Sequence, residues 1–352
     1  MASKNIVHVV GTGTIGEPLI GLFAQFKEKW NIDEVTFHKR TPAPEGRAMV
    51  NSVIKRGARL AADEAARDDF ARLGHRVSYT AEEALDRATV VVDCTPAGNE
   101  NKQGYKRFKG PKGFLAQGSE FGFGKPYARG INDEVQSPDE RFVQIVSCNT
   151  HNISVLLKTL ACDKEGKISL EAGRFVCMRR ANDVSDTKSF IAAPQAGKHD
   201  DPDFGTHHAR DAHHLFQTLG EKLNLFSSAI KLNTQYMHTL WFDLDLHHDT
   251  SLDEVKAAFR NNPRVAVTNK RYVNEIFSFG RDHGYYGRIL SQTVVPIPTV
   301  AVPSSRKIVG FCYTPQDGNS LLSSIAATLR YLDATKIDEN LEVLRPYMFQ
   351  EI

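Results

Sequence analysis

The fold of this 352-residue chain is decided near its start, by the stretch Asn5-Ile-Val-His-Val-Val-Gly-Thr-Gly-Thr-Ile-Gly16. A short apolar run predicts a strand, and a G-x-G-x-x-G pattern follows it where a helical apolar spacing begins. In this context Gly11 permits a tight turn, Gly13 lets backbone approach a pyrophosphate, and Gly16 allows the helix to pack on the strand. We therefore predict a dinucleotide-binding loop; the alternative is a glycine-rich turn that holds no ligand.

The residues after this loop continue to alternate between helix-like and strand-like segments. Apolar residues from Leu19 to Trp30 repeat at helical spacing, and residues 34–39 return as a strand. Thr80 and Glu83 form a capping box before a short helix, and residues 89–94 have the β-branched run of a strand buried on both faces. These patterns predict an α/β domain of the Rossmann type, with helices on both faces of a parallel sheet.

The second half of the chain has longer strand-like stretches. We expect strands at residues 174–180 and 231–246, separated by a polar loop over about 195–210, and a late strand at 306–313. In the second stretch His238 shares one face with Leu240 and Phe242. An amphipathic helix over 320–332 ends the fold, and together these features predict an α+β second domain.

Composition excludes several classes of protein. At about 150 residues per domain, the length fits two domains, and 41% hydrophobic with 24% charged residues is enough apolar side chain for a core in each. Lys and Arg exceed Asp and Glu by 44 − 42 = +2, which disfavours a nucleic-acid partner. No apolar run approaches the roughly 20 residues that span a membrane, so we expect a cytoplasmic protein. The five cysteines are widely spaced without a C-x-x-C pair, which argues against a disulfide framework or structural zinc.

The segment after the second strand bears on the choice of cofactor. It reads Phe37-His-Lys-Arg-Thr-Pro42, without the carboxylate that usually binds the ribose hydroxyls of NAD. Lys39 and Arg40 supply cations and Thr41 a hydroxyl, groups that suit a 2′-phosphate. We expect NADP to bind at least as well as NAD; the alternative is that the two cations only form a solvated turn.

Cys148 is the candidate nucleophile. It lies between a strand-like and a helix-like segment, and a thiol at a helix N-terminus is expected to have a lowered pKa. The other four cysteines lie among apolar neighbours and are expected to be core residues. A thiolate beside a nicotinamide suggests attack on an aldehyde, hydride transfer and cleavage of a thioester, for which a histidine base and cations are also needed.

Six motifs, in order and rough spacing, resemble those of the type II, archaeal-type glyceraldehyde-3-phosphate dehydrogenases. They are Ser147-Cys-Asn-Thr150, Met178-Arg-Arg180, Thr206-His-His208 with Asp211, Met237-His-Thr239, Phe279-Gly-Arg-Asp282 and Tyr313 to Gln316. The resemblance is distant but global. It implies a Rossmann domain over 1–147 completed by a C-terminal helix over 318–352, and a catalytic domain with a mainly antiparallel sheet over 148–317.

The resemblance implies a role for each matching position. Cys148 matches the nucleophile and His238 the catalytic histidine of that family. The positions matching those that hold glyceraldehyde 3-phosphate are Ser147, Asn149, Arg179, His207 and His208. The positions matching cofactor contacts are Thr14, Ile15, Gly118, Ser119, Arg180 and Gln316, with Lys39 and Arg40 at the 2′-phosphate. It further implies phosphorylating, reversible oxidation to 1,3-bisphosphoglycerate with inorganic phosphate, in glycolysis or gluconeogenesis, by a homotetramer.

The sequence also departs from the family pattern. His151 and Asn152 replace Thr-Gly after the nucleophile motif, Phe190 replaces an asparagine, Arg210 lies within the His-His motif, and Gln316-Asp-Gly318 replaces Gln-Glu-Ser. These changes leave open a different phosphorylated aldehyde or acyl phosphate as substrate, or a non-catalytic dinucleotide-binding protein. The histidine pairs at 207–208, 213–214 and 247–248 lack persuasive zinc-site spacing, so we expect no catalytic metal.

Overall fold

A computed structural model describes residues 4–163, 165–183 and 190–352. The chain divides into two compact units. The first unit consists of Met1–Lys125, Gln136–Ile145 and Ser323–Glu342, and the second of Pro126–Val135, Val146–Leu322 and Val343–Ile352. The predicted domain bounds place residues 126–135 and 343–352 with the Rossmann domain, whereas this division places both segments in the second unit.

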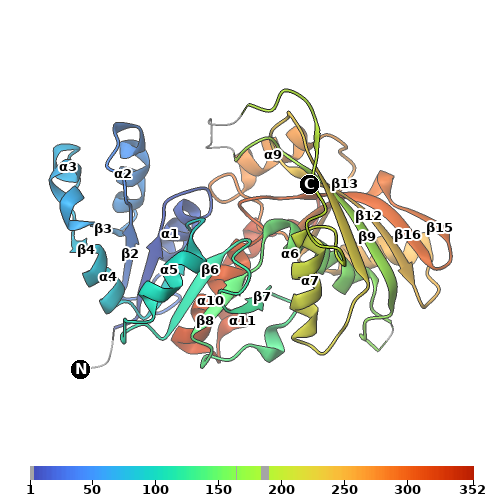
Figure 1. The fold of residues 1–352 in the computed structure, drawn as a ribbon, viewed down its shortest axis with the longest axis horizontal. Helices are drawn as coiled ribbons and strands as arrows, with labels where there is room; N and C mark the ends of the chain where they lie inside the picture. Colours follow the sequence, from blue (N-terminus) through green and yellow to red (C-terminus); the bar gives the residue numbers. More distant parts are fainter. Residues whose placement is uncertain (1–3, 164, 184–189) are drawn as a thin grey trace. The chain divides into compact units, whose positions relative to one another are not determined.

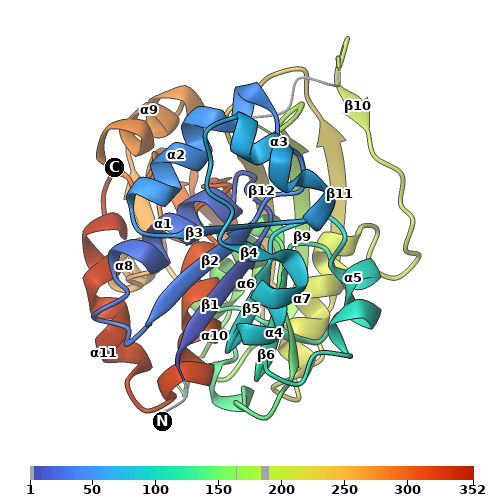
Figure 2. The same ribbon diagram turned by 90° about the vertical axis from the view of Figure 1, so that its left-hand side faces the viewer.

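The first unit is built on a parallel sheet with strand order β4-β3-β2-β1-β5-β6-β8 (Figures 1 and 2). Its strands are β1 (Ile6–Val10), β2 (Glu34–His38), β3 (Arg59–Ala62), β4 (Tyr79–Thr80), β5 (Val90–Asp93), β6 (Gly113–Gln117) and β8 (Phe142–Ile145). The short strand β7 (Lys125–Tyr127) crosses the boundary between the two units along the chain. The prediction of a Rossmann-type α/β fold is confirmed.

Helices connect or follow these strands, and the sequence predicted those over about 19–30, after Thr80 and over 320–332. They are α1 (Gly16–Gln25), α2 (Arg47–Lys55), α3 (Arg67–Arg72), α4 (Ala81–Arg87), α5 (Gly98–Tyr105), α10 (Leu321–Asp333) and α11 (Ile337–Leu341). The capping box of Thr80 and Glu83 is present at the start of α4. On one face of the sheet, side chains of α4 and α5 join Val10 and Val91 in an apolar cluster, which fixes the carboxyl ends of β1 and β5.

The second unit contains a mixed sheet with strand order β10-β11-β9-β12-β16-β14-β13, and β15 pairs with β16. Its strands are β9 (Leu170–Arg179), β10 (Gln195–Ala196), β11 (Leu225–Lys231), β12 (His238–Leu246), β13 (Val265–Thr268), β14 (Thr293–Pro296), β15 (Ala301–Ser304) and β16 (Lys307–Thr314). The pairs β9–β11 and β13–β14 are parallel and the others antiparallel. An α+β unit with a mainly antiparallel sheet is therefore confirmed.

The described residues of this unit form the α-helices α6 (Cys148–Leu160), α7 (His207–Gln217), α8 (Leu252–Asn261) and α9 (Val273–His283). Figure 1 shows α6 and α7 together beside β9. Buried residues alternate along β12 from His238 to Leu246, as predicted. The buried residues that follow His238 in this strand pack in the apolar core with α6 and α7. This packing carries His238 on the same face as the helices.

Two predicted segments differ in the structure. The stretch 231–246 is not one strand, because β11 ends at Lys231 and β12 begins at His238. The polar loop predicted to reach residue 210 ends earlier, since α7 begins at His207. The reason is that Ala209, Ala212 and Phe216 recur at helical spacing and are buried. No helix among the described residues is long and apolar enough to span a membrane.

Candidate active site

Cys148 is the first residue of α6. Ser147 is the N-cap, and its hydroxyl accepts a hydrogen bond from the backbone N–H of Thr150. Serine is favoured at this position because its oxygen satisfies an amide left unpaired by the helix. The nucleophile candidate is therefore held at a helix start, as the sequence predicted, and a second anchor comes from Asn319, whose Nδ2 donates to the Cys148 carbonyl at 2.8 Å.

His238 lies beside the thiol. Its Nδ1 is 4.0 Å from Cys148 Sγ and 3.3 Å from Asn149 Oδ1. His238 opens β12, whereas Cys148 and Asn149 open α6, so the fold brings together residues 90 positions apart. Burial, with smaller effects of Arg180 and Arg179, lowers the pKa of His238 to about 3, so this imidazole is neutral at physiological pH.

The electrostatics of the thiol differ from the sequence-based expectation. Burial, with a smaller contribution from Asp317, raises the pKa of Cys148 to about 11, although Arg180 and Arg179 act in the opposite direction. Desolvation of a thiolate outweighs the favourable position at the helix start. The protein by itself therefore holds Cys148 and His238 as a neutral thiol and a neutral imidazole, not as an ion pair.

Two further histidines are supplied by the start of α7. His208 is buried, and its Nε2 lies 3.5 Å from Asn149 Nδ2 while its Nδ1 has no hydrogen-bond partner. His207 stacks against it, with ring centroids 4.0 Å apart. Burial lowers the pKa of both rings. The buried Nδ1 of His208 is a polar group that needs a partner, as expected of a group that contacts substrate.

The two arginines after β9 have different surroundings. The Arg180 guanidinium is buried and donates to Asp183 at 2.9 Å, to Asp317 at 3.3 Å and to the Tyr236 carbonyl at 3.0 Å. Arg179 is exposed, and it lowers the pKa of both His207 and His208. Two carboxylates already neutralise the charge of Arg180. Arg179 is therefore the better candidate to bind an anionic group near His207 and His208.

The remaining predicted cofactor positions divide between the units. The glycine loop, residues 39–41 and Gly118-Ser119 follow β1, β2 and β6 in the first unit, at the carboxyl edge of the sheet. Gln316 belongs to the second unit, where its Nε2 donates to Asp183 at 3.2 Å. Carboxyl ends of parallel strands are the usual binding edge of such sheets.

A cavity of about 630 Å³ opens at this edge. Of the residues predicted to bind cofactor it is lined by Gly11, Lys39, Arg40 and Thr41. Its other lining residues are His8, Val10, Thr12, His38, Ala81, Leu85, Thr95, Pro96, Ala97, Glu100, Asn101, Gly104, Tyr105, Arg107 and Phe108. The residues of 95–108 were missed at the sequence level, although they follow a predicted buried strand, which is the available signal.

The glycine loop has the conformation that the motif requires. Gly11 has φ +92°, and a Cβ on Gly16 would lie 2.1 Å from the Gly11 carbonyl oxygen. A Cβ on Gly13 would meet nothing within 4 Å, so this glycine faces open space. The turn, the close packing and the free approach to Gly13 fit a bound pyrophosphate.

Sequence reasoning also missed the residues that support Asn149. Thr314 Oγ1 lies 3.0 Å from Asn149 Oδ1, and Asn152 Nδ2 lies 2.8 Å from Thr314 Oγ1. The pairing of β12 with β16, which sets His238 opposite Thr314, is a long-range feature that no local pattern reveals. Among the described residues, no group of three or more His, Cys, Asp or Glu is arranged to hold a metal ion.

Comparison with known proteins supports the resemblance inferred from the motifs, although no family model matches the chain. A glyceraldehyde-3-phosphate dehydrogenase of Methanosarcina barkeri is 27% identical over 79% of this chain and 78% of its own length. Those of Pyrobaculum calidifontis and Methanobacterium bryantii are 26% and 28% identical, over 84% and 74% of this chain and 81% and 73% of their own lengths. The chain is a distant relative of the archaeal glyceraldehyde-3-phosphate dehydrogenases.

Departures from the motifs of the archaeal glyceraldehyde-3-phosphate dehydrogenases now have a structural place. His151 is buried within α6 with its Nδ1 3.1 Å from the Ser147 carbonyl oxygen, and burial lowers its pKa to about 4. Arg210 pairs with Asp211 at 2.8 Å, and Asp317 pairs with Arg180. Phe190 is 90% exposed, so its side chain packs little against the rest of its unit.

Proposed function

We propose that this protein is an NAD(P)-dependent, phosphorylating glyceraldehyde-3-phosphate dehydrogenase. The observation that carries the proposal is the approach of His238 Nδ1 to within 4.0 Å of Cys148 Sγ at the start of α6. A thiol nucleophile with a neutral histidine beside it is the pair that aldehyde oxidation through a thioester requires. Similarity to archaeal glyceraldehyde-3-phosphate dehydrogenases over most of the chain supports the same reaction.

The first step is addition of Cys148 to the aldehyde. A bond forms between Sγ and C1 of the substrate, the electron pair of the C=O bond moves to oxygen, and the thiol proton passes to that oxygen. Backbone amides at the start of α6 stabilise the negative charge as it develops on this oxygen. Since the pKa of Cys148 is raised to about 11, we expect addition to release the proton rather than to start from a free thiolate.

Oxidation follows on the same sulfur. Gly11, Gly13 and Gly16, with Thr14 and Ile15, would hold the dinucleotide, whose nicotinamide would supply the hydride acceptor needed for a thioester to form. His238 takes up the hydroxyl proton of the adduct in this step, which its neutral ring permits. Gly118, Ser119, Arg180 and Gln316 are proposed as further cofactor contacts.

Inorganic phosphate then releases the product. A phosphate oxygen bonds to C1, the C1–Sγ bond breaks, and 1,3-bisphosphoglycerate leaves. The proton stored on His238 returns to the sulfur, which restores the neutral pair. We propose that the reaction is reversible, because phosphate exchanges one activated acyl group, the thioester, for another, the acyl phosphate.

The substrate phosphate is assigned to Arg179, His207 and His208. Arg179 supplies the charge, and the buried, unpartnered Nδ1 of His208 supplies a hydrogen bond to an anionic oxygen. Ser147 and Asn149 are proposed as contacts nearer to C1. Arg179→Ala is expected to raise KM for glyceraldehyde 3-phosphate more than it lowers kcat, because the contact lies away from the reacting carbon.

NADP is proposed to bind at least as well as NAD. Lys39, Arg40 and Thr41 line the cavity at the end of β2, and Lys39 Nζ lies 3.5 Å from Thr12 Oγ1. Burial lowers the pKa of Lys39, which shows that its ammonium group is partly withdrawn from water. A desolvated cation beside an exposed arginine favours a 2′-phosphate over a hydroxyl.

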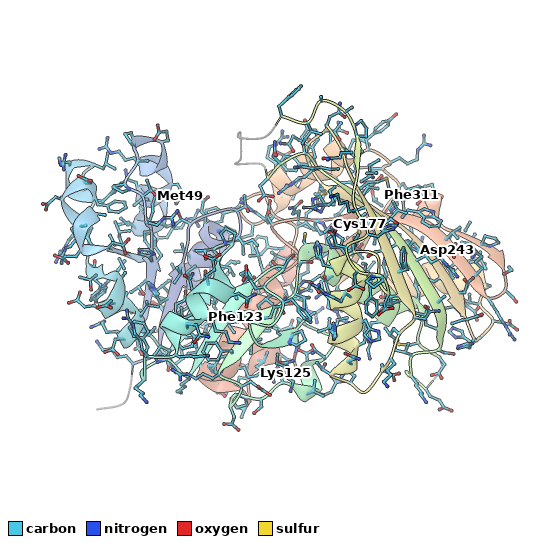
Figure 3. The ribbon with its side chains drawn as sticks, viewed as in Figure 1. Met49, Phe123, Lys125, Cys177, Asp243 and Phe311 are labelled. Atoms are coloured by element: carbon cyan, nitrogen blue, oxygen red, sulfur yellow. The ribbon has the colours of Figure 1, made fainter. Side chains whose placement is uncertain are left out.

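We also propose a homotetramer. Its subunits would contact one another through the face of the second unit's sheet that lies opposite the buried residues of β12. Trp241 and Phe311 are cross-strand neighbours there, and Phe311 is 37% exposed; Figure 3 labels Phe311 together with Asp243 on this sheet. Arg174 pairs with Asp245, and Lys307 with Asp243 and Asp245, around these aromatic side chains. An aromatic patch with both signs of charge suits contact with a second copy. Light scattering that shows a monomer would contradict this.

The test is reduction of NADP, and separately of NAD, with glyceraldehyde 3-phosphate in the presence and absence of inorganic phosphate. Phosphate-dependent turnover that is lost in Cys148→Ser would support the reaction and the nucleophile together. The cofactor ratio tests Lys39 and Arg40. Cofactor binding without turnover on this substrate, followed by turnover on another phosphorylated aldehyde, would replace the substrate and keep the reaction class.

A further inference from the structure

A chain of buried hydrogen bonds leads from the core of the second unit to the two histidines. Cys312 Sγ lies 3.3 Å from Asn152 Oδ1, Asn152 Nδ2 lies 2.8 Å from Thr314 Oγ1, and Thr314 Oγ1 lies 3.0 Å from Asn149 Oδ1. All four residues are fully buried or 1% exposed. The chain continues to His208 Nε2 through Asn149 Nδ2 and to His238 Nδ1 through Asn149 Oδ1.

The direction of these hydrogen bonds follows from the donors available. A thiol has one proton, so the Cys312 S–H donates to Asn152 Oδ1 and turns the amide N–H₂ of Asn152 toward Thr314. Thr314 accepts that N–H and has one proton of its own, which it donates to Asn149 Oδ1. The amide of Asn149 is thereby fixed with its oxygen toward His238 and its nitrogen toward His208.

This orientation selects one tautomer of each histidine. Asn149 Nδ2 only donates, so His208 Nε2 is the acceptor and the ring proton of His208 is on Nδ1. Asn149 Oδ1 only accepts, so the ring proton of His238 is also on Nδ1. The Nδ1–H of His238 then faces Cys148 Sγ at 4.0 Å, and its Nε2 carries the free lone pair.

The two ring atoms left over have different accessibility. Nδ1 of His208 is buried and has no hydrogen-bond partner, so its N–H can donate to an acceptor on a bound ligand. Nε2 of His238 is not among the buried unpartnered atoms of the described residues, and no hydrogen bond to it occurs there. It is therefore the ring nitrogen of His238 that a substrate can reach.

We propose that Asn152 and Thr314 are positioning residues that fix the Asn149 amide, so that His238 presents Nδ1–H to the Cys148 sulfur and Nε2 to the substrate. The proposal deepens the proposed function, on which the catalytic part of it rests. The hydroxyl proton of the Cys148 adduct goes to Nε2, while Nδ1–H keeps its proton and donates a hydrogen bond to the departing sulfur when the thioester is cleaved; exchange with water then removes the Nε2 proton and returns one to the sulfur. Asn152 occupies a position where the family pattern has glycine, so the anchor is a property of this chain.

The tautomers can be measured without any substrate. Solid-state NMR of the full chain labelled with ¹⁵N-histidine distinguishes protonated from bare ring nitrogens, and difference spectra with His208→Asn and His238→Asn assign the two rings. We expect Nδ1–H for both in the wild type. Thr314→Val removes the hydroxyl at nearly constant volume and is expected to give a mixture of tautomers, whereas Thr314→Ser restores the wild-type spectrum.

Kinetics supply the second readout. Thr314→Val is expected to lower kcat about tenfold with a smaller change in KM, less than the roughly 10²–10⁴-fold lost with a general base itself, because the base is misoriented and not removed; Thr314→Ser is expected to recover kcat. Thr328→Val, a buried threonine of the first unit that donates to Ser324 O, is the matched control and should leave both spectra and kcat unchanged.

Nε2–H tautomers in the wild type, or an unchanged Nδ1–H spectrum in folded Thr314→Val, would overturn the proposal. Nδ1–H tautomers that depend on Thr314 in a protein without phosphorylating activity would retain the positioning network and reject the proposed function. Asn152→Ala provides a second removal of the anchor should Thr314→Val fail to fold.

Discussion

The two regions of this molecule that we propose bind cofactor and substrate are built in different ways. The cofactor edge of the first unit uses backbone conformation and partly exposed cations, all within residues 11–16 and 39–41 or at neighbouring strand ends. The cluster around Cys148 in the second unit uses buried, neutral side chains from α6, α7, β12 and β16. The cofactor edge therefore depends on local backbone shape and charge, whereas the cluster around Cys148 depends on the direction of hydrogen bonds between segments distant in the sequence.

The strongest way to separate the two regions is Cys148→Ser. Loss of the sulfur nucleophile is expected to lower phosphorylating activity by at least about 10⁴-fold, as removal of a nucleophile does in other covalent enzymes. NADP affinity, a property of the first unit, should change by less than about twofold. Turnover assays and fluorescence titration measure the two quantities, and comparable loss of both would show that the regions are not separable.

The glycine loop offers a matched pair of substitutions. Gly16→Ala places a Cβ 2.1 Å from the Gly11 carbonyl, so we expect a loss of stability of about 1–3 kcal/mol from overpacking together with weaker cofactor binding. Gly13→Ala meets nothing within 4 Å in the protein, so it should leave the thermal midpoint unchanged and weaken only cofactor binding. Equal destabilisation by both would contradict the assignment of Gly13 to the pyrophosphate.

The cation pair is tested by Lys39→Ala and Arg40→Ala. Each is expected to weaken NADP binding by about 1.5–3 kcal/mol, the range for hydrogen bonds to charged groups, and to leave NAD binding nearly unchanged. Isothermal titration with the two cofactors gives both values. Arg107→Ala, which also lines the cavity but pairs with Glu82, serves as the control cation. If both cofactors lose affinity equally, the pair does not recognise the 2′-phosphate.

The last prediction concerns acid stability. Burial lowers the pKa of His151 to about 4 and that of His8, in the first unit, to about 3. Because the unfolded chain binds these protons near pH 6.5 and the folded chain does not, stability is present above pH 6.5 and is lost as the pH falls toward 4. Each histidine contributes up to about 1.4 kcal/mol per pH unit in that window.

Denaturant unfolding between pH 7 and pH 4 measures this loss. His151→Gln and His8→Gln should each flatten the curve, with His8 acting through the first unit and His151 through the second. An unaltered slope in either variant would mean that the ring is already protonated in the folded protein at the lower pH.

The sequence predicted the parts of the fold that local physics controls. The glycine loop, the capping box of Thr80 and Glu83 and the alternation of β12 all follow from side-chain spacing within a few residues. The break between β11 and β12 was missed, since the residues between Lys231 and His238 carry no strong turn signal such as Asn-Gly. Residues 207–210, the first turn of α7, were assigned to the polar loop because the polar side chains there obscure the helical spacing of the buried alanines.

The reactive side chains of the candidate site could be predicted from the sequence, whereas the residues that hold and orient them could not. Cys148 and His238 could be found from the position at a helix start and from family motifs, and the structure brings them to 4.0 Å. The raised pKa of Cys148 depends on burial and on Asp317, and the orientation of Asn149 depends on Thr314, a strand away. Neither burial nor a pairing across 165 positions has a local sequence signature.

The interleaving of the two units has a consequence for biosynthesis. Although the first unit begins at the N-terminus, its last segment is Ser323–Glu342. The indole of Trp30 donates to the Asn340 carbonyl at 2.8 Å, and Gln117 and Ser324 lie 3.1 Å apart. During translation these partners leave the ribosome only after nearly the whole second unit has been made. Until then, the part of the Rossmann sheet that Ser323–Glu342 covers in the finished protein stays exposed. We expect chaperones to bind the nascent chain during this interval.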